Sequence, residues 1–180
     1  MNDPEPPDAI APLHADVDRE VRRLHVLHAA RLQCKRGCAA CCVDELTVFE
    51  VEAERIRSRH TALLGTEAPH ARGACAFLDD AGACRIYADR PYVCRTQGLP
   101  LRWIEEEDHD RLGAEGSPGV TEFRDICSLN ETAEPIEHMT ENECWTLGPT
   151  EERLARLQLA SSAPTARVAL RDLFVRKERT

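Results

Sequence analysis

Nine cysteines in a chain of 180 residues constrain this sequence more than any other feature. They begin with a dense C-x3-C-x2-C-C run, continue at intervals of eight and nine residues, and end with two isolated members. Short loops let several thiolates turn toward one ion, and remote cysteines commonly complete such sites, so the pattern predicts a metal centre. In order of preference, the candidate ligands are Cys38, Cys41, Cys42, Cys75, Cys84 and Cys94, then Cys34, then Cys127 and Cys144.

Charge and composition exclude several classes of protein. The net charge of −9 argues against nucleic-acid or membrane partners, and no apolar run reaches the roughly 18 residues of a spanning helix. The first twenty residues are acidic and proline-rich, without the basic start and apolar stretch of a secretory signal. We therefore expect a cytoplasmic protein, in a reducing compartment where cysteine clusters bind metal more often than they form disulfides. An odd number of cysteines also excludes complete internal pairing.

The remaining composition predicts a thin core. Aromatic residues make up only 4% of the chain and charged residues 31%, so a metal is expected to supply part of the stability. Apolar periodicity and turn residues predict a small, cysteine-rich, metal-stabilised α+β domain with a short antiparallel sheet and a helical C-terminus. The expected helices are 15–33, 50–64, 150–159 and 166–176; the expected strands are 46–48, 98–104 and 120–129, with a hairpin at 75–87. The expected division is a flexible tail (1–14), the cysteine-cluster domain (15–148) and a C-terminal helical segment (149–180).

The adjacent pair Cys41-Cys42 bears on the number of sites. In an extended chain, neighbouring side chains leave on opposite faces, so the two thiols would serve different partners. Nine thiols allow two four-ligand sites with one left over, or one site with the other cysteines packed as small apolar groups. Both alternatives stay open at this stage. Phe77, Ile86 and Tyr87 are expected to form the core beneath the site.

Charged residues accompany the cysteines. Arg85, Arg90 and Arg95 either lower the pKa of neighbouring thiols and offset thiolate charge, or form ordinary salt bridges with nearby aspartates. His25 and His28 share a helix face close to the first cysteine run and are within reach of a metal, although such histidines are more often surface or boundary residues.

Two motifs carry a resemblance to a known family. The segments C34-KRG-C38-AA-C41-C42 and C75-AFLDDAGA-C84-RIYADRPYV-C94-R resemble the CxxCxxCC, or YkgJ-type, cysteine-cluster family, described as a putative zinc- or iron-chelating domain. The resemblance covers about residues 34–100 and implies metal binding without an assigned reaction. The later segments CRTQGLPLRW and DICSLN resemble a subgroup with extra cysteines, which brings in Cys127 and Cys144.

The function predicted from the sequence is therefore binding of zinc or iron, the iron alone or in an iron–sulfur cluster. The dense run with remote ligands favours iron, whereas zinc sites usually show paired C-x2-C knuckles. One alternative is a redox sensor built on Cys41-Cys42. Another is an iron–sulfur enzyme, because C34-x3-C38-x2-C41 has the spacing of the radical S-adenosylmethionine motif, but the βα repetition of those enzymes is missing. No catalytic motif is present, and no catalytic residue or protein partner is predicted.

Overall fold

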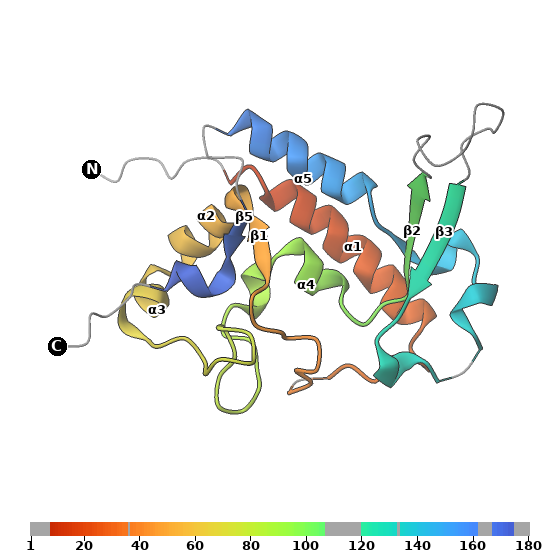
Figure 1. The fold of residues 1–180 in the computed structure, drawn as a ribbon, viewed down its shortest axis with the longest axis horizontal. Helices are drawn as coiled ribbons and strands as arrows, with labels where there is room; N and C mark the ends of the chain where they lie inside the picture. The colour runs from red at the N-terminus through yellow and green to blue at the C-terminus, as the bar shows by residue number, and fades with distance from the viewer. Residues whose placement is uncertain (1–7, 36, 107–119, 133, 162–166, 175–180) are drawn as a thin grey trace, which may run out of the picture.

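A computed structural model of the chain describes residues 8–35, 37–106, 120–132, 134–161 and 167–174. Its long central helix, α1 (Ala11–Leu27), contacts α5 (Pro149–Ala160) on one side and the short α4 (Tyr92–Thr96) on another (Figure 1). Small sheets flank these helices, which confirms the expected α+β class. No helix among the described residues combines the length and the apolar character needed to cross a membrane.

The helix α1 forms because apolar residues recur on one face. Leu13, Val17, Val21 and Leu24 are all buried, at the three- and four-residue spacing of a helix. The helix begins at Ala11 rather than at residue 15, because a proline in its first turn is compatible with helical geometry. Residues 11–14 of the expected tail are thus helical, while residues 1–7 lie outside the described part of the chain.

The C-terminal segment differs from the expectation after α5. Instead of a helix over 166–176, the described residues form the strand β5 (Arg167–Ala169) and a 3-10 helix (Leu170–Leu173). The strand β5 pairs antiparallel with β1 (Thr47–Phe49), so that Val168 lies opposite Val48. The helical prediction was wrong because local periodicity cannot indicate a distant strand partner. Here the partners Thr47 and Arg167 are 120 residues apart in the sequence.

The second sheet is mixed rather than antiparallel. The strand β2 (Leu101–Glu106) pairs antiparallel with β3 (Val120–Asp125) and parallel with the short β4 (Trp145–Thr146). The indole N–H of Trp145 donates to the Tyr92 hydroxyl at 3.0 Å, which ties β4 to α4.

The elements around the first cysteine run pack on a buried apolar cluster centred on Ile56, Phe77 and Leu170. This cluster is separate from the one that includes the buried face of α1. The expected helix 50–64 is interrupted at His60 into α2 (Glu50–Arg59) and α3 (Thr61–Thr66). The irregular segments that carry most of the cysteines run along one edge of the molecule, below α4 in the view of Figure 1. Most of the cysteines are therefore held by loops rather than by regular structure, whereas Cys94 lies in α4.

Candidate metal centre

Four cysteines from three separate segments form what we term the inner group: Cys42, Cys75, Cys84 and Cys94. The Cys75 N–H donates to the Cys42 carbonyl at 2.9 Å, which joins the first run to the next segment. The segment 75–87 folds back as a tight turn with a bridge between Leu78 and Cys84, although it does not form the regular hairpin strands expected. Cys94 lies in α4, where its N–H donates to the Pro91 carbonyl at 3.0 Å.

The inner thiols are close enough to influence one another's ionisation. Burial raises the pKa of Cys94 to about 12, and the charges of Cys75 and Cys84 add to this shift. Burial also raises the pKa of Cys75 and of Cys84. A group of thiols with raised pKa values stays protonated at neutral pH unless a cation stabilises the thiolates.

Two inner sulfurs accept backbone hydrogen bonds in the same way. The Phe77 N–H faces the sulfur of Cys75, and the Ile86 N–H faces the sulfur of Cys84, each two residues further along the chain. Phe77 and Ile86 are themselves almost completely buried, so the backbone that carries these donors is held by packing. Backbone N–H groups aimed at cysteine sulfur stabilise the thiolate form and tune metal sites.

The other four clustered cysteines form what we term the outer group: Cys34, Cys38, Cys41 and Cys127. Burial raises the pKa of Cys34, a hydrogen bond from Asn130 partly opposes the shift, and the charges of Cys38, Cys127 and Cys41 add to it. The Cys38 N–H donates to the Lys35 carbonyl at 2.9 Å, which turns the run back on itself. The outer group therefore joins three members of the first run to a residue far along the chain.

Asn130 connects the two segments of the outer group. Its side-chain N–H groups donate to the Gly98 carbonyl at 2.7 Å and to the sulfur of Cys34 at 3.4 Å, and its Oδ1 accepts the Gln33 N–H at 2.8 Å. Its own backbone N–H donates to the Cys127 carbonyl at 2.7 Å. Asn130 is completely buried. Sequence reasoning did not single it out, and its place in the segment DICSLN, three residues after Cys127, was the only signal available.

The adjacent pair Cys41-Cys42 lies where these groups meet. The two side chains hydrogen-bond to each other, which lowers the pKa of Cys41 and raises that of Cys42. The chain turns here, with the Cys42 N–H donating to the Ala39 carbonyl, and is not extended, so the condition for placing the two side chains on opposite faces is not met. Their further neighbours still differ: Cys75 and Cys94 for Cys42, and Arg90 for Cys41.

Residues 33–115 match the CxxCxxCC family model, described as a putative zinc- or iron-chelating domain. Over this stretch the chain is similar to a CxxCxxCC domain. The match includes seven of the nine cysteines and supports metal binding, with zinc or iron as the ion. No curated protein matched the chain, and no solved structure matched it.

Basic residues within the matched stretch take different roles. Arg90 acts on Cys41, Cys84 and Cys94, and its positive charge favours their thiolate forms. The positive charge of Arg85 likewise favours the thiolate forms of Cys75 and Cys84. Arg95 instead forms a salt bridge with Asp18 at 2.7 Å, and Arg85 also pairs with Glu67 at 3.0 Å. The two alternatives considered from the sequence therefore both occur, and Arg85 shows both.

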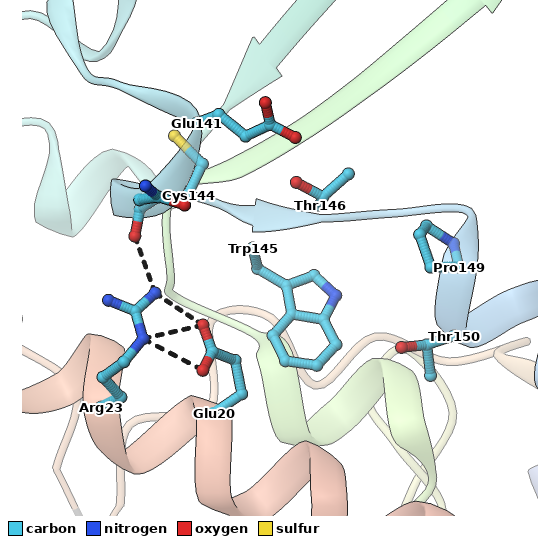
Figure 2. A pocket seen from close by; sticks show the side chains of 9 residues that line it. Glu20, Arg23, Glu141, Cys144, Trp145, Thr146, Pro149 and Thr150 are labelled. Atoms are coloured by element: carbon cyan, nitrogen blue, oxygen red, sulfur yellow. Dashed lines mark hydrogen bonds and ion pairs between the residues drawn. The ribbon is translucent and has the colours of Figure 1, made fainter.

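Cys144 lies apart from the thiols of the matched stretch. It directly precedes β4 and lines a shallow pocket of about 270 Å³, together with Arg23, Glu141 and Trp145 (Figure 2). Burial raises the pKa of Cys144, and its charged neighbours include Arg124, Glu122 and Glu143. Cys144 therefore has surroundings unlike those of the other eight cysteines.

The histidines and Tyr87 are also placed by the structure. His28 is buried, and its Nε2 hydrogen-bonds to the Glu143 carbonyl at 2.6 Å, so this nitrogen is engaged within the protein. His25 is exposed on the same helix, where burial and then Arg90 lower its pKa. Phe77 and Ile86 are buried as expected, but Tyr87 is 66% exposed, because the 3-10 turn Tyr87–Asp89 directs it outward. Tyr87 is therefore not part of the core.

The donor chemistry fits a soft or borderline ion. Cysteine thiolates suit zinc and iron and disfavour magnesium and calcium. Among the described residues, however, no three His, Cys, Asp or Glu side chains converge in a group able to hold a metal ion. The thiols are neighbours without a closed coordination shell.

Proposed function

We propose that this protein binds zinc or iron through two groups of cysteine thiolates, the inner and the outer group. The observation that carries the proposal is the inner group: four thiols from three segments, two of them facing backbone N–H donors on buried residues. Four thiolates complete the usual coordination number of a structural zinc or an iron–sulfur site. Arg85 and Arg90 offset part of the negative charge of such a site.

Binding is expected to be coupled to proton release and to ordering of the loops. The buried thiols have raised pKa values, so they are protonated in the metal-free protein and must lose their protons to bind an ion. Because no closed shell exists among the described side chains, they must also move together around the ion. Metal binding then contributes directly to the stability of a chain with a thin core.

The outer group is proposed as the second site. Cys34, Cys38 and Cys41 come from one run and Cys127 from another segment, a pattern in which a remote ligand completes a local cluster. Cys144 is the cysteine left over, since it is packed among charged groups of its own. A cytoplasmic, reducing location would keep all these thiols available for metal.

Metal and acid-labile sulfide analysis of the full chain, purified without oxygen, tests this function. We expect about two sites per chain; colourless protein with zinc indicates a structural role, and a brown protein with sulfide indicates an iron–sulfur cluster. Cys84→Ser should remove the inner metal and Cys127→Ser the outer metal, whereas the control Cys144→Ser should keep both.

The outcomes separate the parts of the proposal. Equal metal loss in all three variants would overturn the assignment of the groups. Folded wild-type protein without metal would overturn the function itself and favour the redox sensor, with the hydrogen-bonded pair Cys41-Cys42 as its reactive site. Counting thiols before and after mild peroxide treatment would then measure that activity.

A further inference from the structure

A groove of about 620 Å³ lies beside the cysteine cluster, between α1 and the turn at residues 87–90. One wall is formed by α1, including Arg22, His25 and Val26, and the other by Tyr87, Ala88 and Arg90. The volume is in the range of small-molecule sites. The proposed metal sites do not account for this groove.

The charges in the groove do not cancel. Arg95 is neutralised by Asp18, with its N–H groups donating to both carboxylate oxygens at 2.7 and 2.8 Å. Arg22 is exposed and Arg90 is half-buried, and neither forms an ion pair with any described residue. The groove thus gathers two guanidinium groups that have no carboxylate partner among the described residues, in a chain whose net charge is −9.

The side chain of Arg90 is held by a ring contact, but one of its nitrogen atoms lacks a hydrogen-bond partner among the described residues. Its guanidinium lies over the ring of Tyr87, 4.0 Å from the centroid. Its Nε is buried without a hydrogen-bond partner among the described residues. A guanidinium stacked on an aromatic ring is preorganised to bind an oxyanion through its planar fork of donors.

The same groove has an apolar side. Tyr87 is 66% exposed and Val26 is 79% exposed. Large apolar side chains left open next to convergent polar groups are typical of ligand sites, because covering them from water stabilises the complex. The chemistry of the lining therefore combines recognition of an anion with recognition of a ring or an aliphatic group.

We propose that this groove binds a small organic anion, a carboxylate or phosphate attached to an aromatic or aliphatic body. Arg22 and Arg90 hold the oxyanion, while Tyr87 and Val26 contact the body of the ligand. The positive charge of Arg90 also reaches Cys41, Cys84 and Cys94. An anion bound to Arg90 therefore lies next to the cysteine cluster. The proposal concerns a site on α1 and the adjacent turn, and it holds whichever metal the thiols bind.

Calorimetric titration of the full, metal-loaded chain tests the site, with phenyl phosphate as probe. We expect one phenyl phosphate per chain, weaker binding of inorganic phosphate, which has no ring, and no binding of benzylamine, which carries the opposite charge. Arg22→Gln and Arg90→Gln should each weaken binding about tenfold or more, because each removes a charge-assisted hydrogen bond. Tyr87→Ala should weaken binding of phenyl phosphate more than that of inorganic phosphate.

Arg19→Gln is the matched control, since Arg19 lies on the same helix but pairs with Asp16 at 2.5 Å outside the groove. Metal content is measured in every variant. Arg22, unlike Arg90, lies on α1 away from the cysteine segments. The Arg22→Gln variant therefore tests the groove without disturbing the cysteine cluster. Absence of phenyl phosphate binding to metal-loaded wild type would overturn the inference and leave the metal function intact. Equal weakening by Arg19→Gln and Arg22→Gln would overturn it as well.

Discussion

Replacement of Asn130 by alanine tests how the fold joins the two segments of the outer group. The side chain of Asn130 is completely buried and serves two backbone groups, the Gln33 N–H and the Gly98 carbonyl. It also donates to the sulfur of Cys34. The alanine variant keeps the backbone hydrogen bond from Asn130 to Cys127, so the substitution isolates the side chain.

The expected cost follows from the groups left without partners. A buried polar group that loses its hydrogen bond costs about 1–3 kcal/mol. Two backbone groups are affected, so Asn130→Ala should lower the free energy of unfolding by about 2–6 kcal/mol. This is a large fraction of the stability of a small domain. The loop with Cys34 should then separate from the segment with Cys127.

Urea unfolding at matched metal content, followed by circular dichroism, measures the stability. Metal analysis of the same samples measures the outer site, which we expect to be lost while the inner site is retained. The matched control is Asn142→Ala, because Asn142 is exposed and its carbonyl, which accepts from Arg23, is unchanged by the substitution. The control should change stability by less than about 0.5 kcal/mol.

The reasoning would be refuted if Asn130→Ala unfolded at the same urea concentration as the Asn142 control. It would also be refuted if the variant lost stability but kept metal in both groups. The first result would mean that water replaces the lost hydrogen bonds; the second would mean that Asn130 supports the fold without supporting the outer group.

Three further predictions concern the backbone near Cys34, an acidic cluster and the metal itself. Gly98→Ala should cost about 1–2 kcal/mol by urea unfolding, because Gly98 has φ +88° and an added Cβ would lie 2.5 Å from the Cys34 sulfur; unchanged stability would contradict the observed backbone. Although burial raises the pKa of Asp89, hydrogen bonds from His60 and Arg55 hold it below its usual range. Asp89 therefore stabilises the fold above the unfolded pKa, near about 4, and this contribution is lost as the pH falls through the lower folded value. The difference in Tm between wild type and Asp89→Asn should be largest at neutral pH and shrink in acid, and a constant difference would argue against this role. Removal of metal by a chelator should lower the Tm sharply, because the apolar core is thin; metal-free protein with an unchanged Tm would show that the core suffices.

Several features followed from local sequence. The helix α5 and the strand β1 were expected within one residue of their observed bounds, and β2 and β3 overlap the expected strands with ends shifted by up to four residues, because apolar spacing and turn residues act over a few neighbouring residues. The turn at Asp79–Gly82 likewise forms as expected, with the Asp79 carboxylate accepting two backbone N–H groups. The resemblance to the CxxCxxCC family also came from the sequence, since the cysteine spacing is itself a local pattern.

Other features depended on contacts between distant segments. The strand β5, the parallel pairing of β4 and the role of Asn130 all require a partner far along the chain, which periodicity cannot indicate. The direction of Tyr87 was missed because its apolar ring suggested burial, whereas the 3-10 turn that begins at Tyr87 leaves this side chain exposed next to the buried Ile86.

The cysteine pattern by itself predicted a thiolate site for a soft ion, because spacing and residue type define the available donors. Only the tertiary structure decided which cysteines are neighbours: Cys42 with Cys75, Cys84 and Cys94, and Cys34 with Cys127 through Asn130. It also separated Cys144 from them. The physical reason is that packing of Phe77 and Ile86, and the buried hydrogen bonds of Asn130, bring together segments that the linear spacing leaves far apart.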